Sequence, residues 1–115
     1  MKKTIMAALT LVCAAGAHAA SEDVTLHQVT AQGIGESIGK VTISETPYGL
    51  QFAPALSGLK PGIHGFHVHA KGSCEPGESA GKTVAAGAAG GHLDPHNSGK
   101  HLGPYADGHL GDLPA

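Results

Sequence analysis

The sequence contains no arginine or tryptophan, and only two phenylalanines and two tyrosines among its 115 residues. Proteins bind phosphate groups mainly through clustered basic side chains. Residues 20–115 carry five lysines and nine acidic residues, which gives a formal charge of −4. We therefore do not expect a nucleic-acid partner. With eighteen glycines and so few large side chains, the hydrophobic core must be thin, enough for one small domain.

A hydrophobic run long enough to cross a bilayer is also missing. The one sustained apolar stretch, residues 5–15, follows two N-terminal lysines and precedes the small-residue pattern of residues 17–19. This order is typical of a cleaved secretory signal. We predict that residues 1–19 are a signal peptide and that residues 20–115 are exported to the periplasm. No membrane association is expected after cleavage.

Cysteine is scarce, with one residue in the predicted signal and one after it. Cys13 follows Thr10-Leu11-Val12, which lack the small residue expected next to a lipidated cysteine, so we interpret it as an apolar residue discarded with the signal. Export places Cys74 in an oxidising compartment. A single unpaired cysteine is unusual for an exported protein.

No stretch shows a convincing helical period. Short segments rich in β-branched residues predict strands instead. These segments are residues 24–31, 37–45, 48–56 and 62–70. Turn residues separate them, in Gly33-Ile34-Gly35, "ETPYG" and "SGLKPG". The spacing predicts an antiparallel meander, sandwich or barrel.

Two glycine-rich stretches come close to nucleotide-binding motifs without matching them. "GESAGKT" (77–83) is one residue too short between its glycines, and no buried strand precedes it. "GIGESIG" (33–39) misses the dinucleotide-binding spacing and lies between predicted strands, so a hairpin turn is the better interpretation. No serine lies in the strand–turn–helix context of a hydrolase nucleophile.

The second half of the chain is rich in histidine and poor in apolar residues. Residues 71–109 consist mainly of Gly, Ala, Pro, His and Asp. A loop of that length in a compact domain is generally functional or disordered. Eight histidines follow residue 19: His27, His64, His67, His69, His92, His96, His101 and His109. Five of them fall between residues 69 and 109, where metal coordination would order a segment that has no hydrophobic reason to be ordered.

Two groups of these histidines have the spacing of metal ligands. His92, His101 and His109, followed by Asp112, offer three imidazoles and one carboxylate, the donor set of a closed tetrahedral zinc site. His67 and His69 are two residues apart in a predicted strand and therefore project from one face. Such a pair predicts a separate, more open site that suits redox-active copper. A non-catalytic metal buffer and a metal-free β domain with incidental histidines both remain open at this point.

Three stretches, "GIHGFHVHAKGSC", "GGHLDPHNSGKHLGP" and "DGHLGDLP", together resemble the copper–zinc superoxide dismutases, specifically the bacterial exported form. The resemblance covers essentially all of residues 20–115. It implies an all-β fold, a Greek-key β-sandwich or flattened barrel with a long metal-binding loop. It also implies dismutation of superoxide anion, 2 O₂⁻ + 2 H⁺ → O₂ + H₂O₂, which protects the cell envelope. The alternative function is a non-catalytic periplasmic copper/zinc-binding protein.

The resemblance also implies a role for each candidate residue. The copper ligands would be His67, His69 and His92. The zinc ligands would be His92, His101, His109 and Asp112. His92 would bridge both metals and act catalytically by carrying a proton. Cys74 would form a disulfide, His64 would be structural and packed inside, and His27 and His96 match no ligand position.

Some features of the family have no counterpart in the sequence. By resemblance, a fourth copper histidine, the disulfide partner of Cys74 and a guiding arginine would lie beyond Ala115. We therefore expect residues 20–115 to be the N-terminal portion of the domain, an unclosed barrel with exposed edges. Since the family includes bacterial monomers and dimers, a homodimer remains open.

Overall fold

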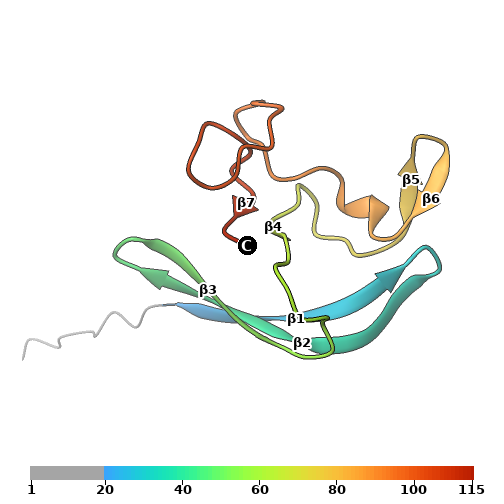
Figure 1. Ribbon diagram of the computed structural model, residues 1–115, viewed down its shortest axis with the longest axis horizontal. Helices are drawn as coiled ribbons and strands as arrows, with labels where there is room; N and C mark the ends of the chain where they lie inside the picture. The colour runs from blue at the N-terminus through green and yellow to red at the C-terminus, as the bar shows by residue number, and fades with distance from the viewer. Residues whose placement is uncertain (1–19) are drawn as a thin grey trace, which may run out of the picture.

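A computed structural model describes residues 20–115 (Figure 1). The predicted signal peptide, residues 1–19, and Cys13 within it lie outside the described residues. The elements are β1 (Ser21–Thr30), β2 (Gly33–Thr46), β3 (Gly49–Leu56), β4 (Phe66–His67), β5 (Gly77–Ser79), β6 (Lys82–Val84), the 3₁₀ turn η1 (Gly87–Ala89) and β7 (Asp112–Leu113). The predicted all-β class is confirmed. No helix in the described part of the chain has the length and hydropathy to span a membrane.

The three long strands form an antiparallel sheet in the order β1-β2-β3. Both hairpin turns contain two residues and use a threonine in the same way. Thr46 Oγ1 donates to the Gly49 carbonyl at 2.7 Å and accepts from the Tyr48 N–H at 3.1 Å. Thr30 makes the equivalent pair of bonds with Gly33 and Gln32 in the first turn. These bonds fix each turn, and with it the register of the strands.

The predicted strands at residues 24–31, 37–45 and 48–56 are confirmed, but residues 33–39 are not the predicted turn. They belong to β2, and the chain reverses at residues 31–32 instead. The glycines fit within the strand because the β1–β2 pairing is irregular, with register shifts on both sides of His27. His27 Nδ1 bonds the Gly35 carbonyl at 3.0 Å across this irregularity, a structural role consistent with its lack of a ligand position.

The prediction of a strand over residues 62–70 was too long, and the segment after residue 71, predicted to be a long loop, contains two short strands and a 3₁₀ turn. Strand β4 contains two residues, because its partner in the described chain is the equally short β7. Between them, β5 and β6 form a hairpin. Its central residues Ala80 and Gly81 both have positive φ, 50° and 74°, as a type I′ turn requires. "GESAGKT" is this hairpin.

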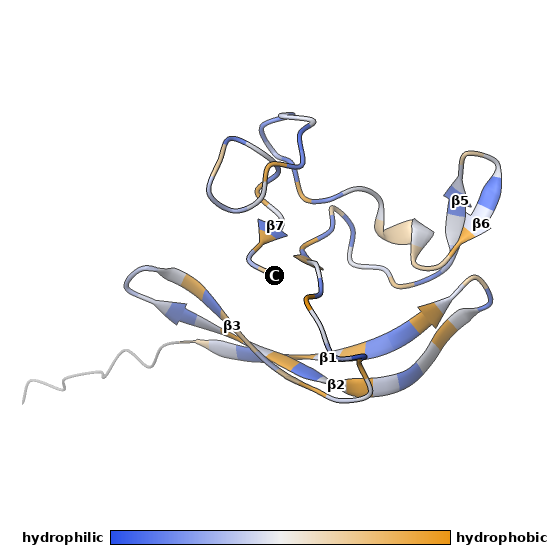
Figure 2. Ribbon diagram, viewed as in Figure 1, coloured by the Kyte–Doolittle hydropathy of each residue, from blue (hydrophilic) through white to orange (hydrophobic). Residues whose placement is uncertain are grey.

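One face of the sheet is apolar and open. Figure 2 shows hydrophobic and hydrophilic residues alternating along β1 to β3, as expected for strands with one apolar face. That face and the segment leading to β4 line an open hollow of about 660 Å³. Phe52 of β3 and Phe66 of β4 meet there edge to face, with ring centroids 5.8 Å apart. This contact ties the metal-binding half of the chain to the sheet.

The apolar core of the described residues is thin, as the composition predicted. Among them, Val41 and Ala89 are the buried hydrophobic side chains, 3% and 6% exposed. The strands within residues 20–115 form no closed barrel, and β1 and β3 are the edges of the main sheet. The prediction that His64 is packed inside was wrong. His64 is exposed, because it lies at the rim of the open hollow, and its Nε2 bonds the Lys60 carbonyl at 2.7 Å.

Candidate metal centre

Three segments that are distant in sequence meet beside β4. Strand β4 pairs with β7, so that His67 lies opposite Asp112. A single bridge then places His69 opposite His92. Backbone hydrogen bonds close the arrangement, from the Val68 N–H to the Gly111 carbonyl at 2.9 Å, from Leu93 to Val68 at 2.8 Å and from Gly111 to Leu93 at 2.9 Å.

Gly111 makes the close approach of these segments possible. A Cβ at this position would overlap the Val68 carbonyl oxygen and would lie 2.9 Å from the Leu93 nitrogen. Both are backbone atoms and cannot rotate away. The centre therefore requires glycine here for space.

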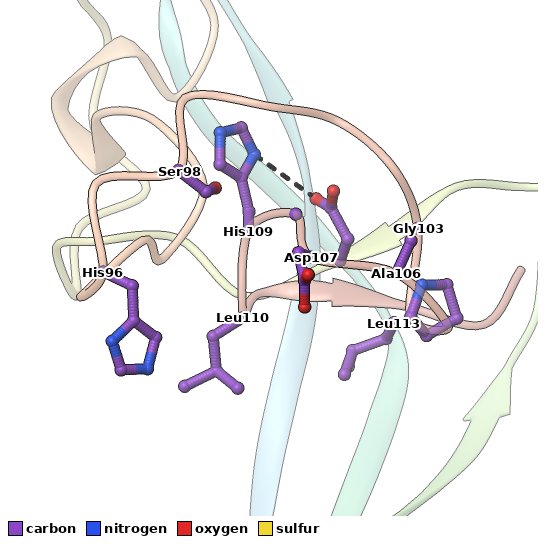
Figure 3. A pocket seen from close by; sticks show the side chains of 11 residues that line it. His96, Ser98, Gly103, Ala106, Asp107, His109, Leu110 and Leu113 are labelled. Atoms are coloured by element: carbon purple, nitrogen blue, oxygen red, sulfur yellow. Dashed lines mark ion pairs between the residues drawn. The ribbon is translucent and has the colours of Figure 1, made fainter.

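The four residues predicted to bind zinc are brought together. One potential ligand atom from each of His92, His101, His109 and Asp112 lies within 4.8 Å of the others. The three imidazoles all turn Nδ1 toward Asp112 Oδ1, at 2.7 Å for His92, 3.9 Å for His101 and 3.6 Å for His109. Figure 3 shows the labelled His109 ring, from which a dashed line marks an ion pair; the ion pair of His109 with Asp112 is the 3.6 Å contact given above. Three nitrogens and one carboxylate oxygen facing a common point match a tetrahedral zinc site.

Two atoms of this group support the fit to a metal ion. His109 Nδ1 and Asp112 Oδ2 are buried and have no hydrogen-bond partner among the described residues. Leaving a buried polar atom unpaired costs free energy, and such atoms usually have a partner in folded proteins. Coordination of a cation by these side chains would give such atoms a partner. The donor set and its unpaired atoms therefore fit zinc.

Opposing effects act on the carboxyl group of Asp112, whose side chain is 4% exposed. Burial is the largest single influence and by itself would raise the pKa. The hydrogen bond from His92 Nδ1 and the nearby His109 and His101 rings act in the opposite direction and together leave the pKa of Asp112 below its usual value. Asp112 is therefore present as a carboxylate at neutral pH, the form that binds a cation.

Two of the three residues predicted to bind copper lie against the ring of the third, His92. The His67 ring stacks on His92 with centroids 4.0 Å apart, and the His69 ring meets His92 edge to face at 5.1 Å. His69 Nδ1 lies 2.9 Å from the Gly90 carbonyl, which can only accept a hydrogen bond. Nδ1 therefore carries the proton, and Nε2 keeps its lone pair for a metal.

His67 is oriented differently from His69. Its Nδ1 lies 3.6 Å from Asp112 Oδ1, on the side of the predicted zinc ligands. Partial desolvation of the ring, which is still 37% exposed, followed by the nearby His92, lowers the pKa of His67. The neutral ring that metal binding needs is favoured.

Asp94 is one residue at the centre that the sequence analysis did not identify. Its Oδ1 accepts from the Ser98 backbone N–H and hydroxyl, both at 3.0 Å, and its Oδ2 accepts from the Gly99 N–H at 2.9 Å. The Gly99 bond is the main reason why the pKa of Asp94 lies below its usual value. Oδ2 is also 3.8 Å from His109 Nε2. An Asp followed within five residues by Ser and Gly is a common turn signal, but the contact with His109 could not be read from spacing.

Other candidate residues lie outside the centre. Cys74 is exposed and forms no disulfide within residues 20–115. His96 is exposed and is not one of the four clustered residues, but it lines an open pocket of about 490 Å³ that His109 and Asp112 also line (Figure 3).

Comparison with known proteins gives a consistent result. The family described as copper/zinc superoxide dismutase (SODC) matches residues 37–115. Superoxide dismutase [Cu-Zn] of Escherichia coli K12 is 62% identical over 115 residues, which are 100% of this chain and 66% of that protein. The Brucella abortus protein of the same name is 49% identical over 114 residues, 99% of this chain and 66% of that protein. The chain thus spans 66% of the length of these relatives.

Solved structures agree with the sequence matches. The solution structure of the monomeric copper, zinc superoxide dismutase from Salmonella enterica has a TM-score of 0.72 and 63% identity, over 83% of this chain and 62% of the other. Cu/Zn superoxide dismutase from Brucella abortus has a TM-score of 0.79 and 53% identity, with the same coverage of both chains.

Proposed function

The chain belongs to the copper/zinc superoxide dismutase family, and on this premise we propose that it is part of an enzyme that dismutates superoxide to dioxygen and hydrogen peroxide. The observation that carries the proposal is the convergence of His92, His101 and His109 on Asp112, with two buried atoms that have no hydrogen-bond partner within residues 20–115. An enzyme of this family needs such a site beside a second, redox-active one.

We assign zinc to His92, His101, His109 and Asp112. In this role Asp112 neutralises charge and its three imidazole partners turn Nδ1 inward. We assign copper to His67, His69 and His92. The Gly90 carbonyl holds the His69 ring in the tautomer that leaves Nε2 available.

His92 belongs to both assignments and is the proposed catalytic residue. Bound copper supplies the one-electron chemistry, which zinc cannot provide. Asp112 lies 2.7 Å from His92 Nδ1 and so fixes the orientation of the ring. Nε2 of the same ring would carry the proton that peroxide needs and release it to the product. A fixed ring that exchanges a proton at one nitrogen suits general acid–base catalysis.

Superoxide dismutation by the intact protein that contains this chain, loaded with copper and zinc, tests this function. We expect His69→Ala to lose copper and activity, because it removes a proposed copper ligand while leaving the zinc group in place. His96→Ala serves as the control, since His96 is an exposed histidine outside the group. Tight binding of both metals by the protein without turnover would contradict the proposal, and so would full activity in His69→Ala.

Export, domain extent and a disulfide, which the sequence also predicts, are proposals as well. We propose that residues 1–19 direct export to the periplasm, that residues 20–115 are the N-terminal portion of the enzyme domain, and that Cys74 forms a disulfide with a cysteine outside residues 20–115. N-terminal sequencing and thiol titration of protein from the periplasmic fraction test the cleavage and the disulfide. Light scattering of the metal-loaded protein distinguishes a homodimer from a monomer.

A further inference from the structure

We propose that Asp94 is a positioning residue for the zinc site, which holds the His109 ring in the tautomer with the proton on Nε2 and the lone pair on Nδ1. The inference rests on the proposed function, since it concerns a ligand of the proposed zinc. Asp94 itself is not among the ligands.

The position of the His109 ring between two carboxylates carries the argument. Nδ1 faces Asp112 Oδ1 at 3.6 Å, and Nε2 faces Asp94 Oδ2 at 3.8 Å. The His109 side chain is 11% exposed and that of Asp94 is 17% exposed, so water screens their interaction only partly. A neutral imidazole carries one N–H, and a carboxylate favours it on the nitrogen that it faces. A carboxylate behind a metal-binding histidine commonly sets the tautomer in this way.

The Asp94 carboxylate is itself held in place. Three hydrogen bonds from Ser98 and Gly99 fix both of its oxygens. The turn that these bonds close leads directly to Lys100, whose carbonyl accepts from the His109 N–H at 3.0 Å. Asp94 therefore acts on His109 through a rigid local framework. Asp112 competes with Asp94, because it favours a proton on His109 Nδ1. When zinc binds, the cation would replace that proton.

The first experiment measures the tautomer directly. Long-range ¹H–¹⁵N correlation spectra of the metal-free protein at about pH 8, where histidines are normally neutral, report which ring nitrogen carries the proton. Because Asp112 also faces Nδ1 in the metal-free protein, we expect a larger fraction of the Nε2–H form of His109 in the wild type than in Asp94→Asn. An unchanged tautomer population in Asp94→Asn would overturn the inference.

The second experiment measures zinc affinity by competition with a chromophoric chelator. Loss of a partner behind a metal ligand typically weakens binding by about 10- to 100-fold, and we expect a loss of roughly tenfold in Asp94→Asn. A control separates the causes. Asp107→Asn removes a charge from an exposed acid of the same loop and should bind zinc within about twofold of the wild type.

The two experiments also separate this inference from the proposed function. A wild-type protein that binds no zinc at these residues would contradict the proposed site, whatever the tautomer. Zinc binding by Asp94→Asn as tight as that of the wild type would overturn the role of Asp94 and leave the zinc site intact.

Discussion

Gly111→Ala tests whether the close approach of three backbone segments creates the metal centre. Gly111 hydrogen-bonds both Val68 and Leu93, and these segments carry His67, His69 and His92, while Asp112 follows directly. An alanine Cβ would overlap the Val68 carbonyl oxygen and press on the Leu93 nitrogen. Since both obstacles are backbone, the segments must move apart.

The size of the effect follows from this overlap. Overpacking of a rigid site typically costs about 1–3 kcal/mol. For a domain of this size, that cost lowers Tm by roughly 5–20 °C. If the strain is relieved by separating the ligands, the same free energy weakens zinc binding by roughly 5- to 150-fold. Most of the loss should then appear as a smaller rise in Tm on addition of zinc.

Thermal unfolding with and without zinc, together with a competition titration, measures both effects. Gly91→Ala is the matched control, because Gly91 precedes His92 and a Cβ there has no atom within 4 Å. We expect the control to resemble the wild type. If Gly111→Ala bound zinc as tightly as Gly91→Ala and unfolded at the same temperature, steric clamping at Gly111 would be refuted.

His101→Ala should weaken zinc binding by more than the roughly 10- to 100-fold cost of losing a partner behind a ligand, whereas His96→Ala should leave the chelator titration unchanged. His69→Ala should abolish copper binding but retain zinc, as metal analysis after dual loading would show; simultaneous loss of both metals would argue against separate assignments. Asp23 accepts hydrogen bonds from Lys40 and Thr42, which lower its pKa in the folded protein. The stabilisation from these bonds is therefore present above the unfolded-state pKa of about 3.9, and it is lost as the pH falls through the lower pKa of folded Asp23. Asp23→Asn should therefore lower Tm slightly at pH 7, with a difference from the wild type that shrinks below about pH 4.

The alternation of apolar and polar residues, a local pattern, predicted the long strands. Alternating apolar residues placed β2 and β3 to within a few residues, because a strand with one apolar face must alternate. Turn chemistry was less reliable, since the glycines of residues 33–39 lie in an irregular strand. The short β4 could not be predicted, because its length depends on β7, which lies far along the chain.

Burial of residues on the open face of the sheet could not be predicted from the sequence either. His64 and Phe66 line the same hollow beside the sheet. Whether that hollow is covered depends on which segments pack over it, and in the described residues His64 is left at its rim. Burial is a property of the assembled chain, so residue type and strand parity predict a face but not its cover.

The sequence by itself determined the chemistry of this protein. The identity and spacing of its histidines and Asp112 define a nitrogen-rich donor set, because side-chain donor atoms are properties of single residues. The tertiary structure decided which nitrogens face inward, how Gly111 lets the segments meet, and that Asp94 lies behind His109. These features depend on distances between residues far apart in the chain, and packing and long-range hydrogen bonds set such distances.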